Sequence, residues 1–235
     1  MKKVIFGAMA LVFIGLVMNS CNKEDLAIKG IKNFDYVGEE HNLRIKPLME
    51  SLVKMNKKSA YKTLEKDSKT KSGSETNVER ELLNCVPCNA INDPEVYLNE
   101  LYSQLNMKVI VYNELSNILG RLDKDFNSLS ELENWIENRK PYINRNFSGK
   151  EKEQVVAFYS TLLHSANFWA PKNENGQGGY DQFVAENGKA WGWKNWLKVA
   201  ACDAVGAVGG AILGNWPGAV VGGVVASACS AINQA

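Results

Sequence analysis

This chain has almost no net charge, and so lacks the feature on which nucleic-acid binding most depends. Its 27 lysines and arginines are balanced by 26 aspartates and glutamates, which leaves a formal charge of +1. Nucleic-acid-binding proteins carry a basic excess or a basic stripe that neutralises phosphates. The composition therefore gives no electrostatic case for a nucleic-acid partner, and we expect none.

Histidine is scarce, and the common catalytic motifs are missing. The two histidines, His41 and His164, stand apart from any serine, cysteine or carboxylate constellation that would mark either one as a base. The chain contains no G-x-S-x-G, H-E-x-x-H or P-loop sequence. We therefore expect a non-enzymatic protein with no catalytic residue, no metal ligand and no cofactor.

One acidic segment begins like a calcium-binding loop but does not end like one. Residues 123–127 read DKDFN, which matches the start of an EF-hand loop. Ser128 stands where that loop needs glycine, and Asn134 stands where it needs a bidentate glutamate. The segment is better interpreted as a polar turn between two helices.

Sustained alternation of apolar and polar residues is also missing, so an extensive β-sheet is not expected. Apolar residues recur instead at helical spacing in several segments. We predict a mainly α fold, in which a small helical bundle is followed by a C-terminal glycine-rich helical hairpin.

The first helical pattern follows Tyr36, and we expect Pro47 to lie in the first turn of this helix or to break it. The segment 65–80 is polar apart from Val78 and predicts a solvated linker. The apolar positions that suggest one core-facing stripe before this linker are Leu43, Ile45, Leu48, Leu52 and Val53.

The next pattern is the strongest, because Asp93 and Pro94 supply an N-cap and a first-turn proline for a helix that runs towards Gly120. Ser128 and Ser148 each open a capping-box sequence. These predict one helix that ends near Pro141 and a longer amphipathic helix that ends before residue 170. The apolar positions of the first of these three helices are Val96, Leu98, Leu101, Leu105, Val109, Val111 and Leu115.

The first twenty residues have the layout of a targeting segment: two lysines, an apolar run over 4–18 and a small-residue junction before Cys21. The apolar run is shorter than the roughly 20 residues of a transmembrane helix. The junction resembles a bacterial lipobox, although Met18 and Asn19 depart from its common pattern. The following Lys23-Glu24-Asp25 resembles the surface-export signal of Bacteroidota-type lipoproteins. The resemblance implies a Cys21 that carries palmitate and an outer-membrane, surface-facing location, and the alternative is a plain secretory signal.

Four cysteines remain once Cys21 is assigned to lipid, an even number that suits disulfides in an oxidising compartment. Three connectivities are open to them. The pairs we expect are Cys85 with Cys88 and Cys202 with Cys229. The C-x-x-C spacing also leaves redox exchange or half a zinc site as alternatives.

Near the C-terminus, glycine recurs every fourth residue and draws a groove along one helical face. Pro217 interrupts the run, which predicts two helical arms. Cys202 and Cys229 are symmetric about the bond between Asn215 and Trp216, as an antiparallel hairpin with a disulfide at its open end would require. The predicted zipper glycines are Gly206, Gly210, Gly214, Gly218 and Gly222.

No charged residue occurs from Ala204 to Ala235, so three arrangements of the hairpin remain open. The arms pack on each other and on the helical domain, or enter a bilayer in part, or drive self-association. For the second arrangement, Trp191, Trp193 and Trp196 are the expected membrane-interface residues, because lysines are interleaved with them.

The domain organisation follows from these segments. A signal peptide covers 1–20 and a lipidated tether 21–35; a helical domain covers 36–170, a Gly/Trp-rich loop 171–198 and the hairpin 199–235. The lipobox, the Y-x-G-E-x-H-N opening at 36–42 and the Gly/Ala-rich tail together resemble uncharacterised Bacteroidota-type lipoproteins. The tail alone is similar to class II bacteriocin hairpins.

These resemblances imply a non-enzymatic cell-envelope lipoprotein that interacts or assembles through its hairpin. The expected partners are the membrane, through the lipid, and a protein partner or a second copy. The alternatives are a membrane-active, bacteriocin-like protein and an envelope thiol oxidoreductase that uses Cys85 and Cys88.

Overall fold

The computed structural model describes residues 34–52, 74–179, 181 and 193–234. These residues form helices and connections and contain no β-strand, which confirms the mainly α prediction. The elements are α3 (Tyr36–Leu52), α5 (Ser74–Cys85), η1 (Cys88–Ala90), α6 (Pro94–Gln104), α7 (Val109–Asp125), α8 (Leu129–Asn146), α9 (Gly149–Trp169), η2 (Lys172–Glu174) and α11 (Trp193–Gln234).

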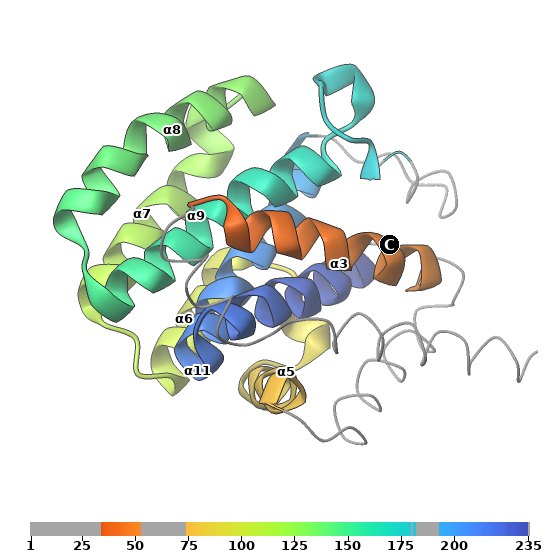
Figure 1. Ribbon diagram of the computed structural model, residues 1–235. Helices are drawn as coiled ribbons and strands as arrows, with labels where there is room; N and C mark the ends of the chain where they lie inside the picture. Colours follow the sequence, from red (N-terminus) through yellow and green to blue (C-terminus); the bar gives the residue numbers. More distant parts are fainter. Residues whose placement is uncertain (1–33, 53–73, 180, 182–192, 235) are drawn as a thin grey trace, which may run out of the picture.

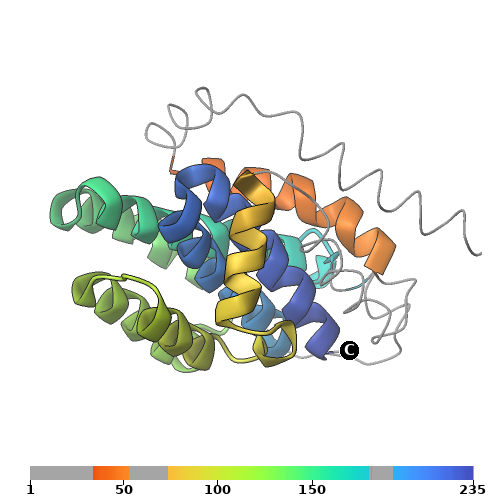
Figure 2. The same cartoon turned by 90° about the horizontal axis from the view of Figure 1, so that it is seen from below.

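The glycine-rich hairpin, α11, is the centre of the bundle. It packs against α9, α5, α3 and α6, and α9 packs in turn against α3 and α8 (Figures 1 and 2). Figure 1 shows α3 and α5 on different sides of the hairpin. The prediction of a bundle plus a hairpin is confirmed, and the hairpin forms the inside of that bundle.

α11 reverses direction at Gly214 and Asn215, whose backbone angles are not helical. Asn215 has a φ of 54° and a ψ of −148°, a positive-φ conformation outside the left-handed helical region that side chains other than glycine rarely adopt. The two arms are therefore 193–213 and 216–234, and Pro217 lies in the first turn of the second arm, where a missing N–H costs little.

The glycine groove of the first arm is filled by the second arm. A Cβ on Gly206 would overlap the carbonyl oxygen of Gly222, and a Cβ on Gly210 would overlap that of Gly218. The reciprocal overlaps occur as well, so the two backbones touch along the groove. Gly214 belongs to the turn instead, where an added Cβ would lie 2.7 Å from Val78 Cγ2 of α5.

The first helix passes straight through its proline. Pro47 lies inside α3, which corrects the expectation of a break. A proline frees the carbonyl four residues earlier, here that of Leu43, whose side chain is 69% exposed, so water can reach this side of the helix. Leu43 is therefore not a core position. The face that packs inward carries Val37, His41 and Ile45.

The segment that begins at Pro94, predicted as one helix, forms two helices, α6 and α7, which corrects the prediction. The N-cap is as expected, since Asp93 accepts hydrogen bonds from the N–H groups of Glu95 and Val96 at 3.0 and 3.1 Å. The chain then turns extended at Leu105, and α7 folds back along α6. A single helix would project away from the core, whereas this break allows both halves to bury apolar faces.

The two capping serines have different outcomes. Ser128 accepts a hydrogen bond from the Glu131 N–H at 3.2 Å, as a capping box requires. Ser148 precedes α9 but makes no side-chain cap bond. α8 continues through Pro141 to Asn146, because the carbonyl that this proline frees belongs to the exposed Glu137.

The segment predicted as a linker is partly helical. α5 begins at Ser74, and Val78 and Leu82 are buried on its inner face. An added Cβ on Gly209 would lie 2.6 Å from a methyl group of Leu82, so α5 packs directly on the first arm of α11. The sequence did not indicate this helix, because Val78 is the only apolar residue in 65–80 and a single apolar residue defines no helical spacing.

Candidate functional site: a sealed polar cluster around Asp203

The first arm of α11 places one carboxylate in the middle of the bundle. Asp203 has no exposed surface, and its Oδ2 accepts hydrogen bonds from three groups on the neighbouring helices. The donors are the hydroxyl of Ser165, the hydroxyl of Ser227 at 2.7 Å and the indole Nε1–H of Trp169 at 3.2 Å. Burial raises the pKa of Asp203 to about 7, and these three hydrogen bonds limit the rise.

α3 brings His41 to the same carboxylate. Its Nε2 lies 3.6 Å from Asp203 Oδ2, and both side chains are fully buried. Burial lowers the pKa of His41 to about 4, so the imidazole is neutral near pH 7 and the pair is not an ion pair there. Asn42 fixes the ring through a 3.0 Å contact with Nδ1 and donates to the His164 carbonyl at 2.8 Å.

The cluster contains the residue types of a Ser-His-Asp triad but not its connections. In that triad the histidine accepts the serine proton and the aspartate orients the histidine. Here both Ser165 and Ser227 donate to Asp203, and neither serine donates to His41. Because none of these side chains is exposed, the arrangement joins four segments and does not present a nucleophile.

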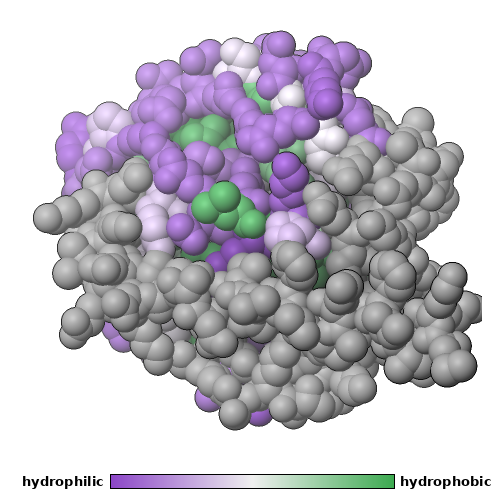
Figure 3. All heavy atoms as spheres, turned by 45° about the vertical axis from the view of Figure 1, so that its right-hand side comes forward, coloured by the Kyte–Doolittle hydropathy of each residue, from purple (hydrophilic) through white to green (hydrophobic). Residues whose placement is uncertain are grey.

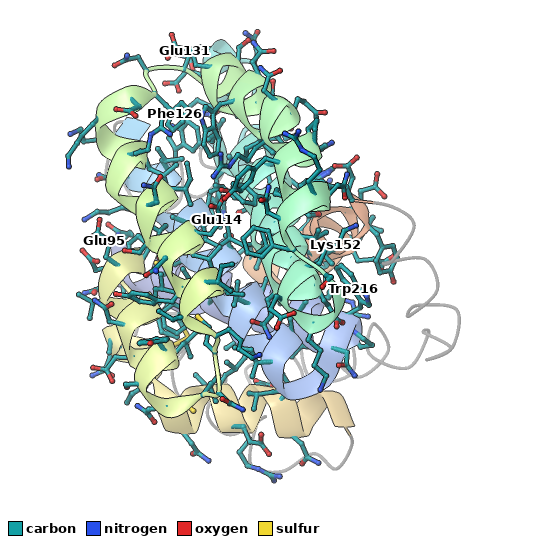
Figure 4. All side chains as sticks on the ribbon, turned by 90° about the vertical axis from the view of Figure 1, so that its left-hand side faces the viewer. Glu95, Glu114, Phe126, Glu131, Lys152 and Trp216 are labelled. Atoms are coloured by element: carbon teal, nitrogen blue, oxygen red, sulfur yellow. A yellow bond between two sulfur atoms is a disulfide. The ribbon has the colours of Figure 1, made fainter. Side chains whose placement is uncertain are left out.

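A second polar cluster fastens α7, α8 and α9 on the far side of the bundle. Arg139 donates to both carboxylate oxygens of Glu114, at 3.0 and 2.8 Å. The Tyr159 hydroxyl donates to Glu114 Oε1 at 2.8 Å. Figure 4 shows Glu114 on α7, beside the space between this helix and its neighbours. Two-point pairing fixes the rotation of α7 against α8 as well as their distance.

The cysteines pair differently from either predicted pair. The disulfide joins Cys88 of η1 to Cys229 of the second arm, and Cys85 and Cys202 are free thiols. Both expected pairs are therefore wrong. The glycine contacts explain the error for Cys202, because Gly206/Gly222 and Gly210/Gly218 are symmetric about Gly214. That register places Ala226, and not Cys229, opposite Cys202.

The free thiols lie in environments that keep them protonated. Burial raises the pKa of Cys202, which has no exposed surface. Burial, and then the charge of Glu81, raises the pKa of the half-buried Cys85. A cysteine that exchanges disulfides with other proteins usually has a lowered pKa. The two free thiols therefore lack the lowered pKa that is usual for such a cysteine.

Of the three tryptophans predicted at a membrane interface, the structure describes the side chain of one, and it corrects the prediction for that residue. Trp196 is fully buried in the bundle, so it does not face a membrane in this structure. Trp191 lies outside the described residues, and so does the side chain of Trp193. Cys21 and the whole targeting segment also lie outside them.

By length and composition, one helix among the described residues could cross a membrane, and it is α11. Its most apolar window is 78% buried inside the bundle. On the face shown in Figure 3, the described residues are mostly hydrophilic, and hydrophobic side chains appear only in small areas. The apolar character of α11 is that of a core element in this state.

Metal binding finds no support in the described part of the chain, where no three histidine, cysteine, aspartate or glutamate side chains gather suitably. Segment 123–127 is the end of α7 and the turn to α8, with Phe126 buried between them. Sequence reasoning missed Asp203. The available signal was a single carboxylate inside a Gly/Ala/Val-rich helix, where a charge must find internal partners.

Comparison with protein-family models, with curated proteins and with solved structures found no match for this chain.

Proposed function

We propose that this protein is a non-enzymatic lipoprotein of the cell envelope, anchored to the outer membrane through Cys21, whose helical domain binds a protein partner. The observation that carries the proposal is the sealing of the Asp203 cluster. It is the described group closest in composition to a catalytic centre, and its serines, histidine and aspartate are all fully buried. Substrate has no access to it, so its contribution is to hold the domain together.

The hairpin is not the binding surface in this proposal. Its glycine groove is already filled by its own second arm, and a second backbone has no place there. The interaction therefore uses an outer surface of the bundle. A suitable one lies where α6 meets α7.

The α6–α7 patch consists of Tyr102, Val109, Ile110 and Tyr112. Val109 and Ile110 are 59% and 52% exposed, which is unusual for large aliphatic side chains next to each other. The rings of Tyr102 and Tyr112 stack with their centroids 4.3 Å apart, and the Tyr112 hydroxyl donates to Asn99 at 2.6 Å. Rigid aromatic residues beside exposed aliphatic ones are typical of protein-binding surfaces.

Site-specific photocrosslinking in intact cells tests the proposal. A photoreactive residue replaces Ile110 in one strain and Leu43 in another, because Leu43 is also an exposed aliphatic residue, is even more exposed than Ile110, and lies on a different helix. We expect a discrete protein adduct from position 110 and none from position 43. Val109→Ser in the same chain should weaken the adduct from 110. No adduct at 110, or equal adducts at both positions, contradicts the proposal.

A second candidate function, a membrane-active protein, is favoured by the dimensions of α11. Its arms, 193–213 and 216–234, contain 21 and 19 residues. At about 1.5 Å per residue they are roughly 30 Å long, close to the thickness of a bilayer core. The first arm carries Lys194 and Lys198 near its start and Asp203 further along, and the second arm carries no charge, so little charge opposes insertion of the second arm.

Dye release from phospholipid vesicles separates the two functions. The purified mature chain, with its disulfide intact, is added to vesicles of phosphatidylethanolamine and phosphatidylglycerol. Release in proportion to protein supports the membrane-active candidate. Intact vesicles, together with the position-110 adduct, support the binding proposal.

A further inference from the structure

The disulfide fastens the end of the hairpin to the outside of the bundle. Cys88 lies in the short η1 helix, and Cys229 lies 141 residues later in the second arm of α11. One turn further along that arm, Asn233 donates to the backbone carbonyls of Cys88 and Ile91 at 2.9 and 3.0 Å. Covalent and hydrogen bonds therefore hold the same two elements together.

A third cysteine stands beside this fastening. Cys85 is the last residue of α5, three residues before Cys88, and its thiol is free. Pro87 connects the two as the N-cap of η1, and Gln104 donates to the Cys85 carbonyl at 2.8 Å. The C-x-x-C spacing is the one used by enzymes that form and break a disulfide within such a loop. Cys85 is only half-buried, so solvent can accept its proton.

We propose that Cys85 can take Cys88 away from Cys229 by thiol–disulfide exchange and so unfasten the second arm of α11 from η1. The Cys85 thiolate attacks Cys88 Sγ, the Cys85–Cys88 bond forms, and the Cys88–Cys229 bond breaks. Cys229 leaves as a thiolate and takes up the proton that Cys85 released to solvent. One disulfide replaces another, so no oxidant or reductant is consumed. This inference does not rest on either proposed function.

The resting structure makes this exchange slow at neutral pH. Burial and the charge of Glu81 raise the pKa of Cys85, so only a small fraction of its thiol is the attacking thiolate. Below that pKa the thiolate fraction rises about tenfold for each pH unit, and the exchange should accelerate in the same proportion. Cys202 cannot serve in its place, because it is fully buried and lies in the other arm.

Peptide mapping can count the free thiols in the peptide that contains Cys88 and in the peptide that contains Cys229. The mature chain is incubated at pH 7, 8 and 9, quenched with acid, denatured with N-ethylmaleimide present and cut with trypsin. Trypsin cuts after Arg80, Lys108 and Lys198 and at no site between residues 81 and 107 or between 199 and 235, so 81–108 and 199–235 are the two informative peptides. The fastened form gives them linked, with one label on each, at Cys85 and Cys202. The exchanged form gives them separate, with no label on the first and two on the second.

We expect the separate, zero-and-two pattern to form faster at each higher pH in the natural chain. Cys202→Ser should exchange at the same rate, whereas Cys85→Ser should keep the peptides linked. A natural chain that stays linked through pH 9 overturns the proposal. So does loss of the linked peptides from Cys85→Ser at the natural rate. Helical circular dichroism of each variant checks its fold, and the natural chain and Cys202→Ser decide the matter if Cys85→Ser does not fold.

Discussion

Burial of Asp203 and burial of His41 shift the pKa values of these side chains in opposite directions. Their effects on the pH dependence of stability therefore oppose each other. The raised pKa of Asp203 means that the folded chain binds more protons than the unfolded chain between about pH 4 and 7. Its contribution to stability is present at low pH and is lost as pH rises through 7. The lowered pKa of His41 has the opposite effect between about pH 4 and 6.5, where its contribution grows with pH.

Replacing each residue alone should therefore change the pH dependence of the free energy of unfolding in opposite directions. We expect Asp203→Asn to make the free energy of unfolding rise more steeply with pH than in the natural chain between pH 4 and 6.5. His41→Gln should make it fall with pH relative to the natural chain over the same range. Urea unfolding at several pH values measures both slopes. If both variants change the slope in the same direction relative to the natural chain, the pair does not titrate as described.

At the scale of the element, the hairpin depends on two backbones being in contact. Gly210→Ala places a methyl group on the carbonyl of Gly218, and backbone cannot move aside as a side chain can. We expect a loss of about 2 kcal/mol or more in the free energy of unfolding, within the range for overpacked cores. Gly120→Ala is the matched control, since its Cβ has only Glu95 Oε1 nearby, at 3.9 Å. That change should stabilise the chain by about 0.5–1 kcal/mol.

Chemical denaturation with both variants measures this difference. Equal effects of the two alanines would mean that the arms do not touch at Gly210. The comparison is informative because both changes add the same atom to a helix and differ only in what that atom meets.

Some features of the helices could be predicted from the sequence alone, and others could not. The caps at Asp93 and Ser128 were predictable because a cap depends on residues within one turn. The passage of α3 and α8 through Pro47 and Pro141 was not, because it depends on which side of each helix is exposed. The break at Leu105 likewise depends on α7 having a core to return to.

The candidate site was less predictable than the fold. The four-residue glycine spacing gave the antiparallel arms, but the position of the turn, and with it the register of Cys202, depends on Asn215 adopting a positive φ. The Asp203 cluster combines residues from 41 to 227, and no local pattern connects positions so far apart. The Cys88–Cys229 disulfide is equally non-local.

At the scale of the whole molecule, the lipid is expected to decide where the domain is found. Cys21→Ser should abolish metabolic labelling with palmitate and move the protein out of the membrane fraction. Cys85→Ser, which removes a thiol elsewhere, should keep both properties. Fractionation of cells that express each variant measures this. Continued labelling of Cys21→Ser would remove the lipid anchor from the proposal.

The described part of the chain is a bundle folded around α11, the one described helix apolar enough to cross a membrane. The coat of α3, α5, α6 and α9 encloses α11, and the disulfide and Asn233 fasten its end. Enclosure on several sides explains how a glycine-rich sequence with few charges remains helical, since isolated helices with so many glycines would be unstable.

Hydrogen exchange of the lipid-anchored protein, with its disulfide intact, on phospholipid vesicles tests this enclosure most directly. The account predicts that the amides of both α11 arms are among the slowest to exchange in the chain, and that vesicles do not change their rates. Fast exchange in α11 without vesicles, or a large change in its rates when vesicles are added, would contradict a hairpin whose groove is closed inside the bundle.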